Sequence, residues 1–144
     1  MITTSRKDAR EHLASQLEGV LVGTGLPAQA IYSYQVGDFQ GQSPVVVVSS
    51  GGSLRERLSF QGMKPKYTIT IHVFVLYADE AGTWTEQDAE DALDDIEEII
   101  ADWVASNQKS PYWEAVSFDA PSQTSSVMVG GKEYRTEVFT VRLA

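Results

Sequence analysis

The amino-acid sequence predicts an α+β domain, with two helices packed on one face of a mainly antiparallel β-sheet and with a projecting β-hairpin. Residues 5–22 and 85–107 both have apolar side chains at steps of three and four, the spacing of amphipathic helices. Between them, residues 67–77 alternate as a β-strand does. The chain ends in two β-rich segments joined by Gly130 and Gly131, a pair typical of a hairpin turn.

Composition indicates one domain, residues 1–144, because 144 residues with 42% hydrophobic content can bury a sizeable core. The first residues are polar and charged, so we expect neither a signal peptide nor a membrane span, and a protein made in a cytoplasm-like compartment. The absence of cysteine excludes disulfides and thiolate chemistry. A formal net charge of −9 argues against nonspecific binding to nucleic acid or anionic membranes, although DNA could still pass by the protein.

The first helix is expected over residues 5–22. Its apolar side chains form one stripe, Ser5 or Thr4 can cap its start, and Gly23 can end it. A short strand over residues 30–36 and a polar loop should follow.

The next strand is expected over residues 45–49, after Pro44, and contains four consecutive valines. Because it lacks polar alternation, both its faces should be covered, one by helices and the other by something else, such as another subunit. Gly51 and Gly52 then predict a turn. Residues 53–66 form a connection with one acid and four bases, the candidate basic side of a subunit interface: Arg55, Arg57, Lys64 and Lys66.

The second helix, over residues 85–107, is the most charged element. Nine of the chain's 20 acids lie in it with no base, which leaves eleven acids against eleven bases elsewhere. Thr85 and Asp88 can form a capping box. Five like-charge pairs four residues apart cost about 1–2.5 kcal/mol in total, whereas each large apolar side chain returns about 1.5–3 kcal/mol on burial. Packing should therefore form the helix and leave a candidate acidic face: Glu90, Asp91, Asp94, Asp95 and Glu98.

The last third of the chain predicts a strand over residues 113–118 and a hairpin formed by residues 126–129 and 132–143. Three charged residues near the turn share a face with the apolar residues that follow: Glu133, Arg135 and Glu137. We therefore expect the turn end of the hairpin to project beyond the core, with Lys132 and Arg135 as candidate contacts to a partner.

No motif predicts catalysis, a metal site or a cofactor. The phosphate-binding patterns GxGxxG and GxxxxGK[ST] and the nucleophile pattern GxSxG are absent. His12 and His72 lie in different elements, His12 as an expected solvated side chain and His72 as a hydrogen-bonded structural one. The acidic run is expected to be a solvated face rather than a cation site or a catalytic pair. A non-enzymatic protein that assembles through oppositely charged surfaces is the interpretation these features favour.

The layout resembles the tail terminator, or tail completion, proteins of long-tailed bacteriophages. After an amphipathic first helix, the segments that carry the resemblance are IYSYQV, SPVVVVSS, KYTITIHVFVLYAD, TEQDAEDALDDIEEIIADWV and GGKEYRTEVFTVRLA. The resemblance implies an α+β domain without enzymatic activity that forms a ring, commonly a hexamer. Such a ring stops polymerisation of the tail tube and offers a surface for head-tail joining.

The expected partners are further copies of this chain, the tail tube protein and the head-connector protein. The protein would act in virion assembly in the host cytoplasm and remain in the virion at the tail or neck. It would make no specific contact with nucleic acid, although DNA would pass through the ring. The acidic face would line that lumen or contact a neighbouring subunit, and the sequence leaves both open.

Two alternatives remain. One is a different phage neck protein, such as a head closure or head-tail connector protein, which would bind a portal-type ring. The other is a small ligand-binding domain or enzyme of the cytoplasm, which should have a preformed apolar pocket with convergent polar groups.

Overall fold

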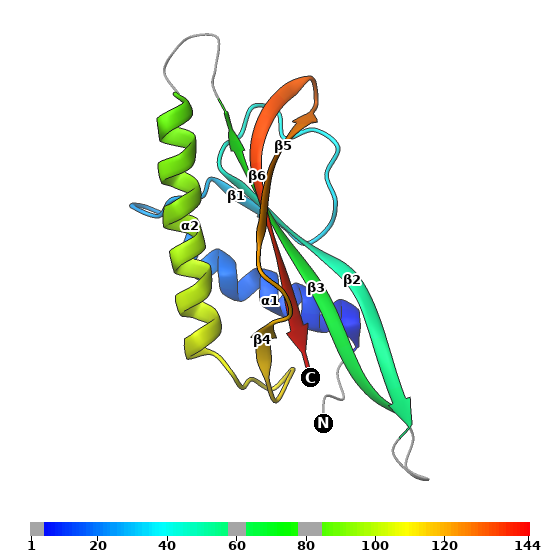
Figure 1. Ribbon diagram of the computed structural model, residues 1–144. Helices are drawn as coiled ribbons and strands as arrows, with labels where there is room; N and C mark the ends of the chain where they lie inside the picture. Colours follow the sequence, from blue (N-terminus) through cyan, green and yellow to red (C-terminus); the bar gives the residue numbers. More distant parts are fainter. Residues whose placement is uncertain (1–4, 58–62, 78–84) are drawn as a thin grey trace.

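The computed structural model describes residues 5–57, 63–77 and 85–144. In chain order the elements are α1 (Arg6–Leu21), β1 (Ala30–Tyr32), β2 (Val45–Arg57), β3 (Met63–Leu76), α2 (Glu86–Ser106), β4 (Val116–Phe118), β5 (Gln123–Val129) and β6 (Lys132–Leu143) (Figure 1). The six strands form one sheet in the order β1-β2-β3-β6-β4, and β5 also pairs with β6. β1 and β2 are parallel and the other pairs are antiparallel. The predicted α+β fold is confirmed.

Both helices begin at the predicted caps. The Ser5 side chain accepts a hydrogen bond from the backbone N–H of Asp8 at 3.1 Å. In α2, the Thr85 hydroxyl accepts from the Asp88 N–H at 3.1 Å, and the Thr85 N–H donates to the Asp88 carboxylate at 2.9 Å. These bonds satisfy N–H groups that a first helical turn otherwise leaves unpaired.

The main core lies between the two helices and one face of the sheet. α1 contributes Leu13 and Leu17, α2 contributes Ile96 and Ile100, and alternate residues of β3, such as Ile71, meet them from the sheet. All five side chains are fully buried. The predicted helical stripes and the alternation of β3 therefore account for this core.

The second face of the valine strand is covered by the chain itself. Phe39, from the loop between β1 and β2, is buried against Val45 and Val47. Its ring centroid lies 4.9 Å from that of Phe74 and 5.4 Å from that of Tyr134. No second subunit is needed to bury the valines, so the expectation that another subunit could cover them is replaced by this packing.

The turn predicted at Gly51 and Gly52 is wrong. β2 continues through both glycines to Arg57, with a register shift between Ser50 and Gly52 that marks a β-bulge. A Cβ added at Gly51 would lie 3.2 Å from Thr68, which is tighter than most Cβ contacts, so glycine favours the close approach of the two strands. Residues that we expected to form a basic connection instead pair as the outer part of the β2–β3 hairpin, from Ser53–Tyr67 to Arg57–Met63, which we call the basic arm.

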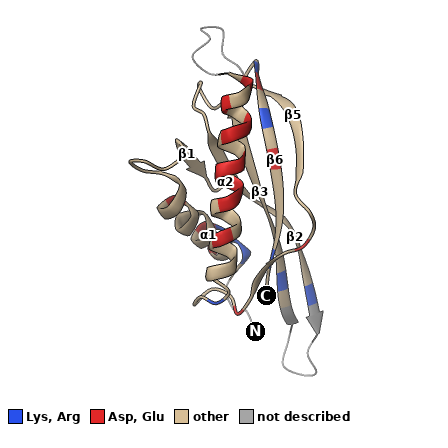
Figure 2. Cartoon of the chain, turned by 60° about the vertical axis from the view of Figure 1, so that its left-hand side comes forward, with Lys and Arg blue, Asp and Glu red and all other residues tan. Residues whose placement is uncertain are grey.

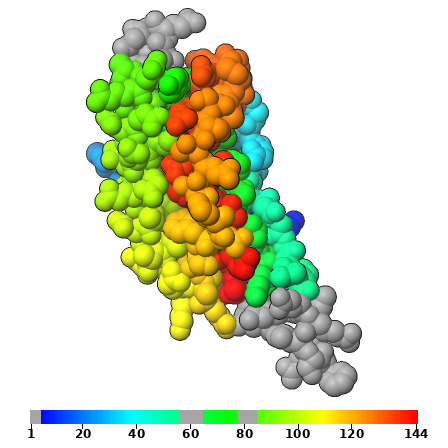
Figure 3. Space-filling view, in the orientation of Figure 1, coloured from blue at the N-terminus to red at the C-terminus, as the bar shows by residue number. Residues whose placement is uncertain are grey.

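The β5–β6 hairpin has the predicted turn. Gly130 and Gly131 have φ values of 58° and 80°, the left-handed region that favours glycine. β5 begins three residues earlier than expected and runs beside α2 (Figure 3). Of the three charged residues that suggested a projecting turn, Glu137 is buried and Arg135 bonds to α2. Projection of this hairpin toward a partner remains a prediction.

Two strands are shorter than predicted. β1 ends at Tyr32 rather than at residue 36, and β4 begins at Val116 rather than at residue 113. Trp113 precedes β4 in a turn in which the Ser110 N–H donates to the Trp113 carbonyl at 2.9 Å. Its buried ring contacts Trp103 of α2, with centroids 6.2 Å apart.

We predict that Phe39→Ala will lower the free energy of unfolding by about 3–5 kcal/mol, because it removes a buried ring and leaves a cavity over the valines. Tyr34→Ala is the matched control, since Tyr34 lies in the same loop with 61% of its surface exposed, and it should cost about 0.5 kcal/mol or less. Urea denaturation at one protein concentration measures both. Equal losses would contradict the packing role of Phe39.

Candidate functional site

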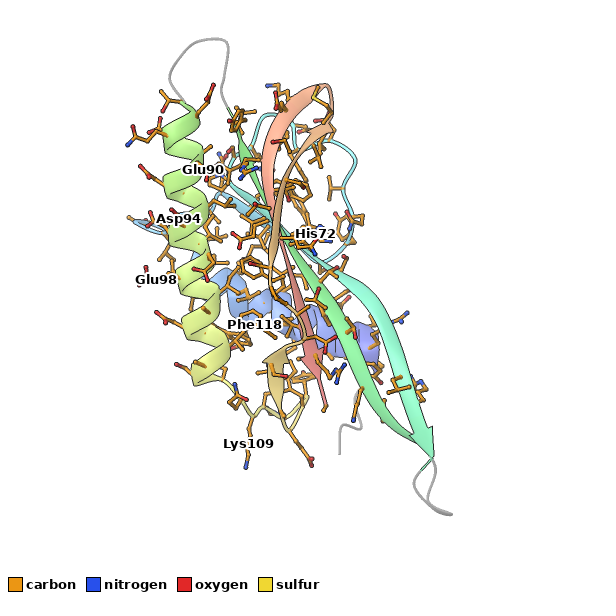
Figure 4. The ribbon with its side chains drawn as sticks, in the orientation of Figure 1. His72, Glu90, Asp94, Glu98, Lys109 and Phe118 are labelled. Atoms are coloured by element: carbon orange, nitrogen blue, oxygen red, sulfur yellow. The ribbon has the colours of Figure 1, made fainter. Side chains whose placement is uncertain are left out.

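Six of the nine acids of α2 form two rows, because the packing of the helix fixes its rotation. The inner acidic row, Glu90, Asp94 and Glu97, faces β5 and β6. The outer acidic row, Asp95, Glu98 and Asp102, borders the loop that follows α1. Figure 4 shows Glu90, Asp94 and Glu98 on successive turns of α2. Because the two rows have different surroundings, one can interact with the chain's own sheet and the other can contact a partner.

The inner acidic row interacts with the chain's own sheet. The Arg135 Nε donates to a carboxylate oxygen of Glu90 at 2.8 Å, and an Arg135 Nη contacts the Thr124 hydroxyl at 3.4 Å. Arg135, a candidate contact to a partner, is therefore held by α2. The other hairpin candidate, Lys132, has its ammonium beside Gly41, where an added Cβ would lie 3.5 Å from it.

Glu137 is a buried carboxyl group beside this row. It is 7% exposed and accepts a hydrogen bond from the Ser122 hydroxyl at 2.6 Å. Burial raises the pKa of Glu137 above 4.5, and the negative charges of Glu97 and Asp94 raise it further. The Ser122 hydrogen bond and Arg135 oppose this shift only in part. Glu137 was expected to project with the hairpin, but it is buried close enough to Asp94 and Glu97 of α2 to feel their charges.

The outer acidic row lines a surface groove between α2 and the loop after α1, which we call the α2 groove. It consists of two adjoining hollows of about 470 and 540 Å³ that share Leu26, Ile99 and Asp102. Val20 and Trp103 complete an apolar floor, and the outer acidic row forms the rim. Within the described ranges, none of the three rim carboxylates forms an ion pair.

The basic arm contains four of the chain's 11 lysine and arginine residues. Leu54 and Lys66 are cross-strand neighbours on it, and 54% of the Leu54 surface is exposed. The Arg55 guanidinium lies over the Tyr67 ring, 5.7 Å from its centroid. Arg57 and Lys64 belong to the paired strands, but their side chains lie outside the described residues.

α1 anchors the base of the basic arm. Arg6 donates to the Ser53 hydroxyl at 3.1 Å, and Arg10 donates to the Ser50 hydroxyl at 3.2 Å. From this base the arm extends away from α2 (Figures 1 and 2). Figure 2 shows Lys and Arg near the outer ends of β2 and β3, and Asp and Glu along α2. The two charged surfaces therefore lie on different sides of one molecule.

The sequence predicted only some of the residues that line the α2 groove. Asp95 and Glu98 were predicted as acidic-face residues and line the groove, whereas Asp91 of the same prediction is exposed outside it. Leu26 and Asp102 were not singled out as site residues. An apolar side chain within the turn-rich segment GTGLP was the available signal for Leu26.

Both histidines have structural surroundings. His12 was expected to be solvated, but its ring stacks on Tyr112 with centroids 4.1 Å apart, and burial lowers its pKa. His72 has the expected hydrogen bond, with Nε2 3.2 Å from the Thr70 hydroxyl, and burial lowers its pKa as well. In the described part of the chain, no three His, Asp or Glu side chains are grouped so that they could hold a metal ion.

No model of a known protein family matches this chain, and no curated protein matches it. None of the described helices has the length and apolar content needed to span a membrane.

We predict that Glu137→Gln will stabilise the protein at neutral and alkaline pH. Because the pKa of Glu137 is raised above 4.5 in the folded state, the native protein loses stability as pH rises from 4.5 through the folded pKa. Glutamine can still accept the Ser122 hydrogen bond without carrying the charge. The gain in melting temperature should therefore be largest near pH 8 and vanish near pH 4.5.

Glu133→Gln is the matched control, since Glu133 is exposed on the same face of β6. It should change the melting temperature little at any pH. A gain for Glu137→Gln that did not vary with pH, or a loss at pH 8, would contradict the conclusion that the surroundings of Glu137 disfavour its ionised form.

Proposed function

We propose that this protein is a structural virion component similar to the phage tail terminators, whose copies form a ring that caps the tail tube and offers a head-tail joining surface. The observation that carries the proposal is the separation of charge: the basic arm and the outer acidic row lie on different sides of one chain. Neither neutralises the other within the described part of the molecule.

Unlike surfaces on different sides of one molecule favour a heterologous contact between copies. Such a contact repeats from copy to copy and produces a ring when its rotation closes. Complementary charge favours the correct register and speeds encounter. The α+β fold supports the proposal further, because it is the fold that the resemblance to tail terminators implies.

A ring of this kind has the three partners expected from the resemblance: further copies of the chain, the tail tube protein and the head connector. The inner acidic row contacts its own sheet, so the outer acidic row is the part of the helix that supplies the subunit contact. DNA would pass through the lumen without specific contacts, and the net charge of −9 disfavours its adhesion.

Native mass spectrometry over a range of protein concentrations, followed by particle imaging, tests this function. One closed oligomer with a central hole, six copies being the expected number, would support it. The ring should also stop elongation when added to polymerising tail tube protein from the same phage. A compact monomer at all concentrations would overturn the proposal, and a ring without effect on elongation would favour another neck protein.

We predict that Arg55→Glu will raise the dissociation constant of the oligomer about tenfold or more, because it places a negative charge on the arm that meets an acidic surface. Lys7→Glu, the same charge change at an exposed position on α1, should have a much smaller effect. Raising the salt concentration should weaken the wild-type oligomer by screening. Sedimentation velocity at several salt concentrations measures both, and equal effects of the two substitutions would contradict the interface.

A further inference from the structure

We propose that the α2 groove is the docking site for the basic arm of a second copy, an inference that rests on the proposed ring and names its contact. Among the surfaces described, this groove combines an exposed apolar floor with a rim of unpaired carboxylates. The basic arm combines an exposed apolar side chain with cations. The two surfaces are complementary in both respects.

The floor of the groove explains why charge alone would not define the contact. Leu26 is 38% exposed in its loop, and Ile99 at the edge of the α2 stripe is only partly buried. On the arm, Leu54 is exposed beside Lys66 on one face of the paired strands. Docking would bury apolar surface from both copies, and this burial favours association.

The electrostatics favour the C-terminal half of α2 over its N-terminal half. The Glu90 carboxylate is already paired with Arg135, whereas the outer acidic row has no such partner among the described residues. The last turn of α2 carries no basic residue to offset the negative end of the helix dipole. A lysine of the arm placed near Asp102 would meet both the carboxylate and the dipole.

The arrangement requires two copies. The loop after α1 emerges beside α2, while the arm of the same chain ends away from α2, at the lower right of Figure 1. The arm of one copy can therefore reach the groove only on a neighbour. Each copy then donates one arm and accepts one, the heterologous pattern that a ring needs.

A charge exchange tests this contact. Lys66→Glu and Asp102→Lys should each raise the dissociation constant of the oligomer about tenfold or more, and the double variant should recover most of the loss, because the ion pair is rebuilt with its charges reversed. The control is Lys66→Glu with Asp91→Lys, which changes an exposed acid of the same helix outside the groove and should not recover it.

Disulfide trapping provides a second measurement, because the chain has no cysteine of its own. Leu54→Cys with Leu26→Cys should form a covalent ladder of oligomers on oxidation. Leu54→Cys with Met128→Cys should not, although Met128 is 66% exposed on β5. The ladder requires the arm of one copy to lie at the groove of another, since disulfides form only when the two Cα atoms lie within about 7 Å.

The outcomes separate the two proposals. Recovery by the charge exchange together with the specific ladder supports docking of the arm in the α2 groove. If the wild-type protein forms closed rings but neither result appears, the docking site is overturned and the proposed function stands. A wild-type protein that stays monomeric at all concentrations overturns both.

Discussion

The packing of α2 against the sheet is the interaction on which the rest of the structure depends. A helix with nine acids and no base is disfavoured by its own charge, and it forms because Ile96, Ile100 and Trp103 are buried in the main core. The same packing fixes the rotation of the helix about its axis. One row of carboxylates must then face β5 and β6, and the other must border the loop after α1. Burial of the apolar stripe therefore decides which carboxylates of α2 face the sheet and which line the α2 groove.

The structure distributes its unpaired charge over two distant surfaces. Arg135 pairs with Glu90 of the inner acidic row, and four other cations lie on an arm that α1 anchors through Arg6 and Arg10. A single chain therefore leaves opposite charges apart, and a second copy can bring them together. In such a contact the charges would contribute register and speed of association, while the apolar side chains Leu54, Leu26 and Ile99 would contribute most of the affinity.

The sequence predicted those features that depend on local pattern. The capping box of α2, the alternation of β3 and the two-glycine turn of the β5–β6 hairpin can each be recognised within about ten residues. The errors occurred where a distant partner decides the outcome. Gly51 lies in a bulge rather than a turn because β3 continues to pair beyond it, and Phe39 covers the valines because its loop folds back. The α2 groove joins Leu26 to Ile99, whose proximity no local pattern could indicate.

The central claim is that copies of this chain meet through surfaces of opposite charge that one copy cannot bring together. Electron cryomicroscopy of the purified assembly, at a resolution that separates strands from helices, tests it most directly. The claim predicts that each β2–β3 arm crosses the C-terminal half of α2 in the next copy and that this contact repeats around a closed ring. Copies related by twofold axes through one shared patch, with the arm and the α2 groove both facing solvent, would contradict it.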